Sequence, residues 1–302
     1  MSIPNIYHFV FGFKTQTEEF HLIYNLCIRS CVEINKPDKI YFHYRNLPYG
    51  PLWDEIQPFI TLNKIEATFF VDTFAYSSKD IEPLRYAHLA DIVRLEVLKQ
   101  YGGIYADIDT IFVNPLPDYF FQQRCIMGKE RADFQKIAAV KAGGSLCNAW
   151  IASEQEAAFC KLWLNHLSDE FDGTWSAHST FLPYRLSQEH PELIGIEPER
   201  SFYHFDWTET GIKRIFNELD TDLKGVYSIH LWNHVWWNPE INNYRRITNQ
   251  KISRLYILYG NTTYGFIASR YFRPDTLWII GKTRFLIEKY SFYLKTFLRN
   301  LR

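Results

Sequence analysis

Two carboxylates separated by one apolar residue, Asp107 and Asp109, follow a short apolar stretch in YGGIYADIDT (101–110). An ionised carboxylate is costly to bury without a partner. Residues two apart on a strand point to the same face, so both side chains can address one object. Two close carboxylates repel each other unless a cation lies near them, and oxygen ligands suit Mg²⁺ or Mn²⁺ together with substrate phosphates. The pair therefore predicts a metal–nucleotide site.

A D-x-D pattern is weak evidence by itself, because roughly one is expected by chance in a chain of this length. The sequence contains a second copy, Asp220 and Asp222, in NELDTDLKG. That segment is polar and ends in glycine, which is typical of a solvated loop or a helix end. Asp107 and Asp109 differ in position, because they follow a strand that comes after a helix. Ligands of open α/β sheets bind at the carboxyl ends of strands.

The helix before the acids carries a second charged pair. On a 3.6-residue wheel of residues 83–101, the polar arc consists of Arg85, Glu96, Lys99 and Gln100. Asp91 and Arg94 fall instead on the apolar side, three residues apart and therefore in reach of each other. One interpretation is a buried structural ion pair, but such pairs stabilise little on balance, so we favour a functional role. Gly102 and Gly103 are expected to turn the chain tightly and to bring the helix end close to the next strand.

The order of the expected elements indicates an α/β fold. Apolar and aromatic runs predict the strands, and 3.6-residue periodicity predicts the helices. The expected strands are 3–12, 39–45, 65–72, 103–109, 125–130, 145–152 and 225–232, and the expected helices are 18–35, 83–101, 154–170 and 179–188. Their alternation in the first part of the chain implies a mostly parallel central sheet with covering helices. We expect one domain over residues 1–240 and a C-terminal extension over residues 241–302.

The composition is that of a globular protein. The residues AVILMFWYC make up 47% of the 302 positions, and the formal net charge of −1 gives no general attraction to nucleic acid. Cys27 and Cys31, one helical turn apart, are expected to be core residues in a reducing compartment. No signal peptide is expected, and no apolar run approaches the ~20 residues of a membrane-spanning helix. These features predict a cytoplasmic protein.

The tail from Arg270 onward is basic and aromatic. It carries eight basic residues, among them Lys282 and Arg284, against the acidic Asp275 and Glu288. A basic, aromatic, amphipathic helix can lie on an anionic membrane surface, which would place residues 270–302 on the inner face of the plasma membrane. The alternative is a helix that packs its aromatic side on the domain, and the sequence leaves both open.

The segment RYAHLADIVRLEVLKQYGGIYADIDTIFVNPL (85–116) resembles the signature of the DXD-containing sugar transferases of glycosyltransferase family 32. That group includes initiating α-1,6-mannosyltransferases, globotriaosylceramide synthases and glucosylating clostridial toxins. IPNIYHFVFG (3–12), NAWIAS (148–153) and SIHLWN (228–233) resemble its opening, middle and closing motifs. The resemblance implies a GT-A fold, in which one α/β domain binds a nucleotide sugar through a divalent metal, usually Mn²⁺.

The resemblance also implies roles for individual residues. Asp109 is expected to ligate the metal, Asp107 to meet the ribose or the metal, and His230 to be the third ligand. Asp91 and Arg94 are expected to contact the donor sugar and its phosphates. The further expected contacts are Tyr7, His8 and Phe9 near the base, Tyr105 on the nucleotide or sugar, Asn148 on the donor sugar, and Trp232 and Asn233 along the pyrophosphate or sugar pocket.

Two positions of the closing segment depart from a simple match. A histidine in an aromatic strand is by itself more often a core residue, and only the resemblance favours a ligand role for His230. Val235 stands where family members often carry a small hydroxyl residue, which leaves the pyrophosphate contact at that position open.

Together these features predict a metal-dependent hexosyltransferase, and the resemblance implies that it retains anomeric configuration. The expected donor is a nucleoside diphosphate sugar, with UDP favoured and GDP-mannose open. The expected acceptor is a hydroxyl of a glycan or lipid-linked oligosaccharide, as in capsule, lipopolysaccharide or other surface polysaccharide synthesis. Two alternatives share the fold: a toxin-like transferase that glycosylates a protein, and a noncatalytic nucleotide-sugar-binding module. A phosphoryl transferase or nuclease is disfavoured, because the sequence has no GxxxxGK[ST] loop.

Overall fold

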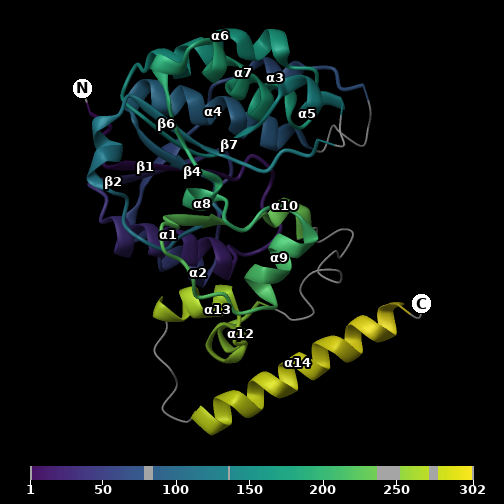
Figure 1. Ribbon diagram of the computed structural model, residues 1–302. Helices are drawn as coiled ribbons and strands as arrows, with labels where there is room; N and C mark the ends of the chain where they lie inside the picture. The colour runs from purple at the N-terminus through teal and green to yellow at the C-terminus, as the bar shows by residue number, and fades with distance from the viewer. Residues whose placement is uncertain (1, 78–83, 135–136, 237–251, 272–277, 301–302) are drawn as a thin grey trace.

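Strands and helices alternate along the chain in the computed structural model, which describes residues 2–77, 84–134, 137–236, 252–271 and 278–300 (Figure 1). The strands are β1 (Ile6–Phe11), β2 (Lys39–Tyr44), β3 (Thr61–Lys64), β4 (Gly103–Ala106), β5 (Thr110–Phe112), β6 (Cys125–Lys129), β7 (Leu146–Ser153), β8 (Gly195–Glu197) and β9 (Ser228–His230). The helices are α1 (Leu22–Asn35), α2 (Pro51–Asp54), α3 (Phe70–Thr73), α4 (Arg85–Tyr101), α5 (Ile137–Ala142), α6 (Ala158–Glu170), α7 (Leu182–Glu189), α8 (Glu199–Phe202), α9 (Glu209–Phe216), α10 (Asn233–Trp236), α12 (Arg254–Tyr259), α13 (Thr263–Ala268) and α14 (Trp278–Asn300).

The central sheet is mostly parallel, as predicted. Its strand order is β3-β2-β1-β4-β7-β6-β8, and β5 and β9 form a separate two-stranded sheet. The four strands from β3 to β4 run parallel, whereas β7 runs antiparallel to both β4 and β6. Because β7 runs the other way, its first residues lie beside the carboxyl end of β4. The sheet thus brings residues from distant segments to one edge.

Helices cover both faces of this sheet, with α1 on one side and α4, α6 and α7 on the other (Figure 1). Each face has its own apolar core. Successive β4 side chains alternate between the two cores: Ile104 and Ala106 join the core on the α1 side, and Tyr105 joins the core on the α4 side. All five cysteines are free and buried, which confirms the core assignment of Cys27 and Cys31.

Gly102 and Gly103 make the tight link between α4 and β4 that the sequence predicted. Their φ angles are +64° and +106°, a region that side-chain-bearing residues rarely adopt. A Cβ on Gly103 would also clash with the carbonyl oxygen of Ile6 on the neighbouring β1. The link therefore fixes the start of β4 directly against β1, and with it the position of the acids that follow β4.

A buried chain of hydrogen bonds supports this link from the β1 side. The His8 Nε2 lies 2.8 Å from the Gly102 carbonyl oxygen, which can only accept, so Nε2 carries the proton. His8 Nδ1 then accepts from His43 Nε2 at 3.0 Å, and His43 Nδ1 accepts from the Asn63 amide at 2.9 Å. Burial lowers the pKa of His8 to about 4 and that of His43 to about 3. Both imidazoles are therefore neutral in the folded protein at neutral pH.

Two expected strands are corrected by the structure. Residues 65–72 do not form a strand; β3 lies just before them, and α3 begins within them. The cause is local, because the Asp72 carboxylate accepts from the Phe69 N–H at 2.8 Å and pairs with Arg45, and so fixes a helix start. The strand expected over 225–232 shortens to Ser228–His230, the three residues that pair with β5.

The C-terminal part packs on the domain through α12 and α13. Tyr256 of α12 is buried and its hydroxyl donates to the Phe216 carbonyl of α9 at 2.6 Å. The expected domain boundary at residue 240 lies outside the described residues, so the division of the chain stays a prediction. Within the described residues, no helix has both the length and the apolar composition needed to cross a bilayer.

Candidate active site

A cavity of about 630 Å³ lies at the carboxyl ends of β1 and β4. Its walls come from the end of β1, one side of α4, the β4–β5 turn, the start of β7 and the segment around β9. This is the size of pocket that binds substrates and cofactors in proteins. The sequence-predicted residues that line it are Asp91, Arg94, Tyr105, Asp107, Asp109, Asn148, His230, Trp232 and Asn233.

Asp107 and Asp109 lie in the turn between β4 and β5, just beyond the strand that was expected to contain both. The Asp107 N–H donates to the Ala149 carbonyl of β7 at 2.8 Å, and the Thr110 N–H donates back to the Asp107 carbonyl at 2.9 Å. These bonds hold the turn closed and anchor it to the central sheet. The two carboxylates still point toward the same place, but their orientation is set by the turn conformation and not by the alternation of side chains along a strand.

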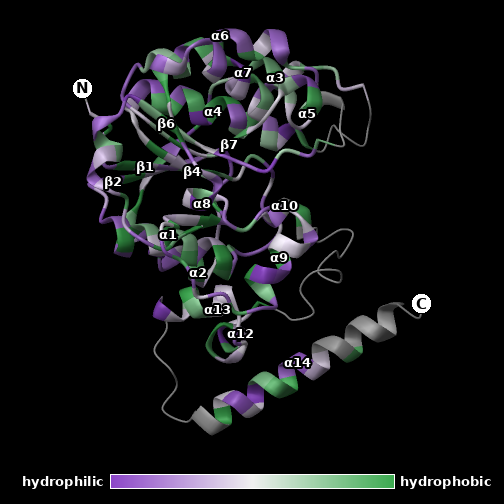
Figure 2. Cartoon of the chain, viewed as in Figure 1, coloured by the Kyte–Doolittle hydropathy of each residue, from purple (hydrophilic) through white to green (hydrophobic). Residues whose placement is uncertain are grey.

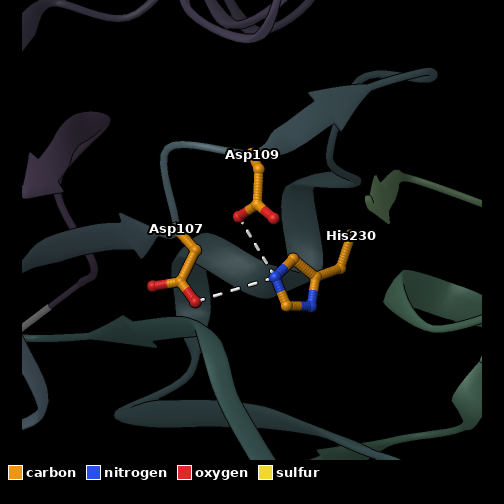
Figure 3. A group of neighbouring side chains, drawn as sticks. All are labelled: Asp107, Asp109 and His230. Atoms are coloured by element: carbon orange, nitrogen blue, oxygen red, sulfur yellow. Dashed lines mark hydrogen bonds and ion pairs between the residues drawn. The ribbon is translucent and has the colours of Figure 1, made fainter. Parts of the chain in front are cut away.

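His230 reaches the two acids through the small sheet. β9 pairs antiparallel with β5, and its register sets His230 opposite Thr110. His230 Nε2 lies 3.2 Å from Asp109 Oδ1 and 3.7 Å from Asp107 Oδ2 (Figure 3). The backbone N–H of Asn233 donates to the second oxygen of Asp109 at 2.8 Å. The closing segment thus brings its histidine to the acids and also orients one of them.

Positive charge near this cluster stabilises its two carboxylates. Burial raises the pKa of Asp107, and Arg94 and His230 only partly offset that effect. Burial alone would lower the pKa of His230, but Asp109 and Asp107 outweigh it and hold the pKa above its ordinary value. The two carboxylates thus favour a positive charge beside them, which a bound cation would also supply.

The donor set fits a divalent metal. Asp107, Asp109 and His230 each offer one ligand atom, and the three atoms lie within 4.8 Å of one another. Carboxylate and imidazole ligands together suit Mn²⁺, and the carboxylates alone suit Mg²⁺. The cluster lies on the cavity wall, so a bound metal would face whatever occupies the cavity.

Arg94 and Asp91 form the buried pair that the helix wheel predicted. Arg94 Nη2 lies 2.9 Å from Asp91 and 3.5 Å from Asp107, and Nη1 donates to the Asn148 carbonyl at 2.6 Å. Its guanidinium also lies over the Tyr105 ring, 4.6 Å from the centroid. One arginine thus ties α4 to the acid turn and to β7, and its charge is shared between two carboxylates.

Asp91 has two further partners, one on the oxygen that Arg94 contacts and one on the other oxygen. The Asn148 amide donates to Asp91 Oδ1 at 2.7 Å, and His178 Nε2 lies 2.9 Å from Oδ2. Burial would raise the pKa of Asp91, but Arg94 and His178 outweigh it, and the pKa lies below its ordinary value. The carboxylate is therefore ionised and held in one orientation at the cavity wall.

Tyr105 and Trp232 both line the cavity and are both held by hydrogen bonds. The Tyr105 hydroxyl donates to Asp107 Oδ1 at 2.5 Å. The Trp232 indole N–H donates to the Phe205 carbonyl at 2.8 Å, and its ring centroid lies 4.1 Å from that of His230. Trp232 has a φ of +55°, which is uncommon for a bulky residue and typical of functional segments.

The placement of Tyr7, His8 and Phe9 is corrected by the structure. All three are fully buried in the middle of β1, and the cavity wall begins only at Val10. The three residues lie within β1, whose last two residues, Val10 and Phe11, reach the cavity. Phe11 lines the cavity in their place.

Glu130 is a cavity residue that the sequence reasoning did not identify. It follows β6 and accepts from the Ser145 hydroxyl at 2.5 Å. Burial raises the pKa of Glu130, and the bond from Ser145 only partly offsets this. The available signal was the same as for Asp107, an acid directly after a buried strand.

The second D-x-D pair lies away from the cavity and has structural partners. Asp220 pairs with Arg214 at 2.7 Å, and its N–H donates to Thr263 at the start of α13. Asp222 pairs with Arg200 at 3.0 Å, and its side chain is 74% exposed. The expectation that this pair belongs to a loop outside the site is confirmed.

Comparison with known proteins agrees with this geometry. A family model described as "Glycosyltransferase sugar-binding region containing DXD motif" matches residues 26–132, which include α4, both glycines and both acids. Residues 26–132 are therefore similar to a DXD-type glycosyltransferase region. The chain is also 35% identical over 240 residues to "Glucan organizing enzyme 1" of Cryptococcus neoformans. That match covers 77% of this chain and 63% of the length of the relative.

Solved glycosyltransferases resemble the chain more distantly. GlyE of Streptococcus pneumoniae is 11% identical with a TM-score of 0.42, and the match covers 80% of this chain and 62% of GlyE. Mouse xyloside xylosyltransferase 1 is 10% identical with a TM-score of 0.39, and the match covers 74% of this chain and 96% of the mouse chain.

Proposed function

We propose that the protein is a metal-dependent glycosyltransferase that takes its sugar from a nucleoside diphosphate sugar. One observation carries the proposal: Asp107, Asp109 and His230 form a cation site on the wall of the same cavity that Asp91 and Arg94 line. The DXD-type region supports it, because it contains four of these five residues. A noncatalytic copy of the fold would have had no reason to keep all of them in contact.

The metal would be held by Asp109, Asp107 and His230, with Mn²⁺ as the first candidate. When bound, it would act as a Lewis acid that neutralises the charge of the departing diphosphate. Arg94 adds a fixed positive charge to the same wall, and fixed charges of this kind stabilise charge that develops during a reaction. Trp232 and Asn233 line the same wall and would position the diphosphate.

Asp91 and Asn148 would bind the donor sugar. Asp91 is ionised and held by three side chains, so it can accept from sugar hydroxyls without moving. Preorganised acceptors of this kind lose little entropy when substrate binds. Tyr105 holds Asp107 and shapes the floor between the metal and the sugar.

The finer features of the reaction rest on the resemblance. We propose retention of anomeric configuration, a UDP-sugar before GDP-mannose as donor, and a hydroxyl of a glycan or lipid-linked oligosaccharide as acceptor. The fungal relative is named for the organisation of glucan, which supports a glycan acceptor.

A hydrolysis screen tests the proposal. Many transferases slowly hydrolyse their own donor, so the protein is incubated with a panel of UDP- and GDP-sugars with Mn²⁺ and with chelator. We expect release of free nucleotide from one or a few donors, only with metal, and its loss in Asp109→Asn. A protein that binds nucleotide sugars with Mn²⁺ but hydrolyses none, and transfers none to added saccharides, would be a binding module and would contradict the proposal.

A further inference from the structure

Helix α14 has one face fixed to the domain. Phe285 is only 7% exposed and belongs to the core shared with α12. Gly281 lies so close to Tyr259 of α12 that a Cβ would overlap the tyrosine hydroxyl. The Ser253 hydroxyl, at the start of α12, donates to Glu288 at 3.0 Å. These contacts set the rotation of α14 about its own axis, so the composition of its opposite face has meaning.

The opposite face is exposed and mostly apolar, and the exposed Thr283 lies within it. Its large apolar side chains, with their exposed fractions, are Ile280 (47%), Leu286 (42%), Ile287 (65%), Tyr290 (68%) and Leu294 (59%). At about 100° per residue they fall within an arc of roughly 120° that is centred opposite Phe285. We call these five residues the outer face. Figures 1 and 2 show α14 at the periphery of the molecule, beyond α12.

Positive charge borders the outer face on both sides. On the same wheel Lys282 lies at one edge of the arc and Arg284 at the other, and both side chains are exposed. The sequence of the whole helix has five basic residues and one acidic residue, Glu288, and that residue is bonded on the inner side. An apolar stripe between two basic rims is typical of helices that lie in the membrane interface.

The charge pattern decides between the possible occupants of this face. A second copy of the helix would bring the two basic rims together, and like charges beside an apolar seam oppose pairing. An anionic lipid surface offers both an apolar layer for the stripe and negative charge for the rims. We propose that the outer face of α14 binds the surface of an anionic membrane, such as the cytoplasmic leaflet of a plasma membrane, with the helix parallel to the surface.

Vesicle binding of the full chain tests this proposal. Co-sedimentation is measured with vesicles of phosphatidylcholine alone and of phosphatidylcholine mixed with phosphatidylglycerol. We expect binding to the mixed vesicles that weakens as salt is raised, because the rim charges are screened. Ile287→Glu should weaken that binding at least about tenfold, because it places a charge in the apolar stripe that becomes buried in the membrane on binding. Lys282→Glu combined with Arg284→Glu should abolish the preference for anionic vesicles.

A matched control separates this result from a general loss of apolar surface. Val140 on α5 is 59% exposed and lies outside the outer face, so Val140→Glu should bind vesicles like the wild type. Thermal unfolding and sedimentation of each variant show that it is folded and give its oligomeric state. Equal binding to both vesicle types, or a wild-type dimer that Ile287→Glu converts to monomers, would overturn the proposal, the latter by showing that a second copy covers the face.

Discussion

The buried His8–His43 pair makes the stability of the fold depend on pH in a defined direction. Burial lowers the pKa of His8 to about 4 and of His43 to about 3, whereas both are near 6.5 in the unfolded chain. Between these values the unfolded state binds more protons than the folded state. The contribution of the two neutral histidines to the free energy of unfolding is therefore fully present above about pH 6.5. It is lost as the pH falls from there toward the pKa values of the folded state. At pH 5 each histidine lowers the free energy of unfolding by about 2 kcal/mol relative to neutral pH, or by about 4 kcal/mol for the pair.

The assay is urea unfolding at a series of pH values from about 7.5 to 5. A loss of about 4 kcal/mol would be a large fraction of the stability of a typical domain. His88, whose pKa burial lowers to about 4, adds to this loss, whereas His230 acts in the opposite direction because its pKa is raised.

A designed variant isolates the pair. Asn63 lies on the edge strand β3 and donates to His43, so Asn63→Asp replaces that donor by a carboxylate that accepts from it. The new charge should raise the pKa of His43 and remove up to half of the loss at pH 5. Stability that stays constant from pH 7.5 to 5 in the wild type, or an unchanged slope in Asn63→Asp, would refute the reasoning.

Two further predictions concern the elements around the site. Gly103→Ala should destabilise the protein by at least about 2 kcal/mol, because it combines a left-handed φ with a clash against β1. Gly225 has a φ of +74° with open space around it, so Gly225→Ala should cost only about 1 kcal/mol in the same unfolding assay. Equal effects would show that the close approach is unimportant. Asn148→Ala should remove one bond to Asp91, lower stability by about 1–3 kcal/mol and raise the KM for donor hydrolysis; an unchanged KM would place the donor sugar elsewhere.

The features that could be predicted from the sequence are those with local causes. The wheel position of Asp91 and Arg94 predicted a buried pair, and the two glycines predicted a tight link, because periodicity and φ preferences act over a few residues. The strand expected over 65–72 was wrong because the bond from Phe69 to Asp72 starts a helix in an apolar run. Such a competition between two local signals is not resolved by composition.

The contacts between distant segments were harder to predict. His230 meets Asp109 across 121 positions of sequence, which only the family resemblance indicated, and the pairing of β5 with β9 that brings them together was not predicted. The expected base contacts at residues 7–9 lie within β1, and the cavity wall begins one residue beyond them at Val10, because the part of a strand that lines a cavity depends on its neighbours in the sheet. Glu130 was overlooked for the same reason: β7 brings Ser145 beside it.

The most direct test of the central claim is calorimetric titration of Mn²⁺ and nucleotide into the wild type, Asp109→Asn and Asp220→Asn. Both substitutions remove one carboxylate charge from a D-x-D pair, but only Asp109 lies in the cation cluster. We predict nucleotide binding that requires Mn²⁺ in the wild type and in Asp220→Asn, and no metal-dependent binding in Asp109→Asn. Wild-type titrations of Mn²⁺ and nucleotide in Asp109→Asn would contradict the account.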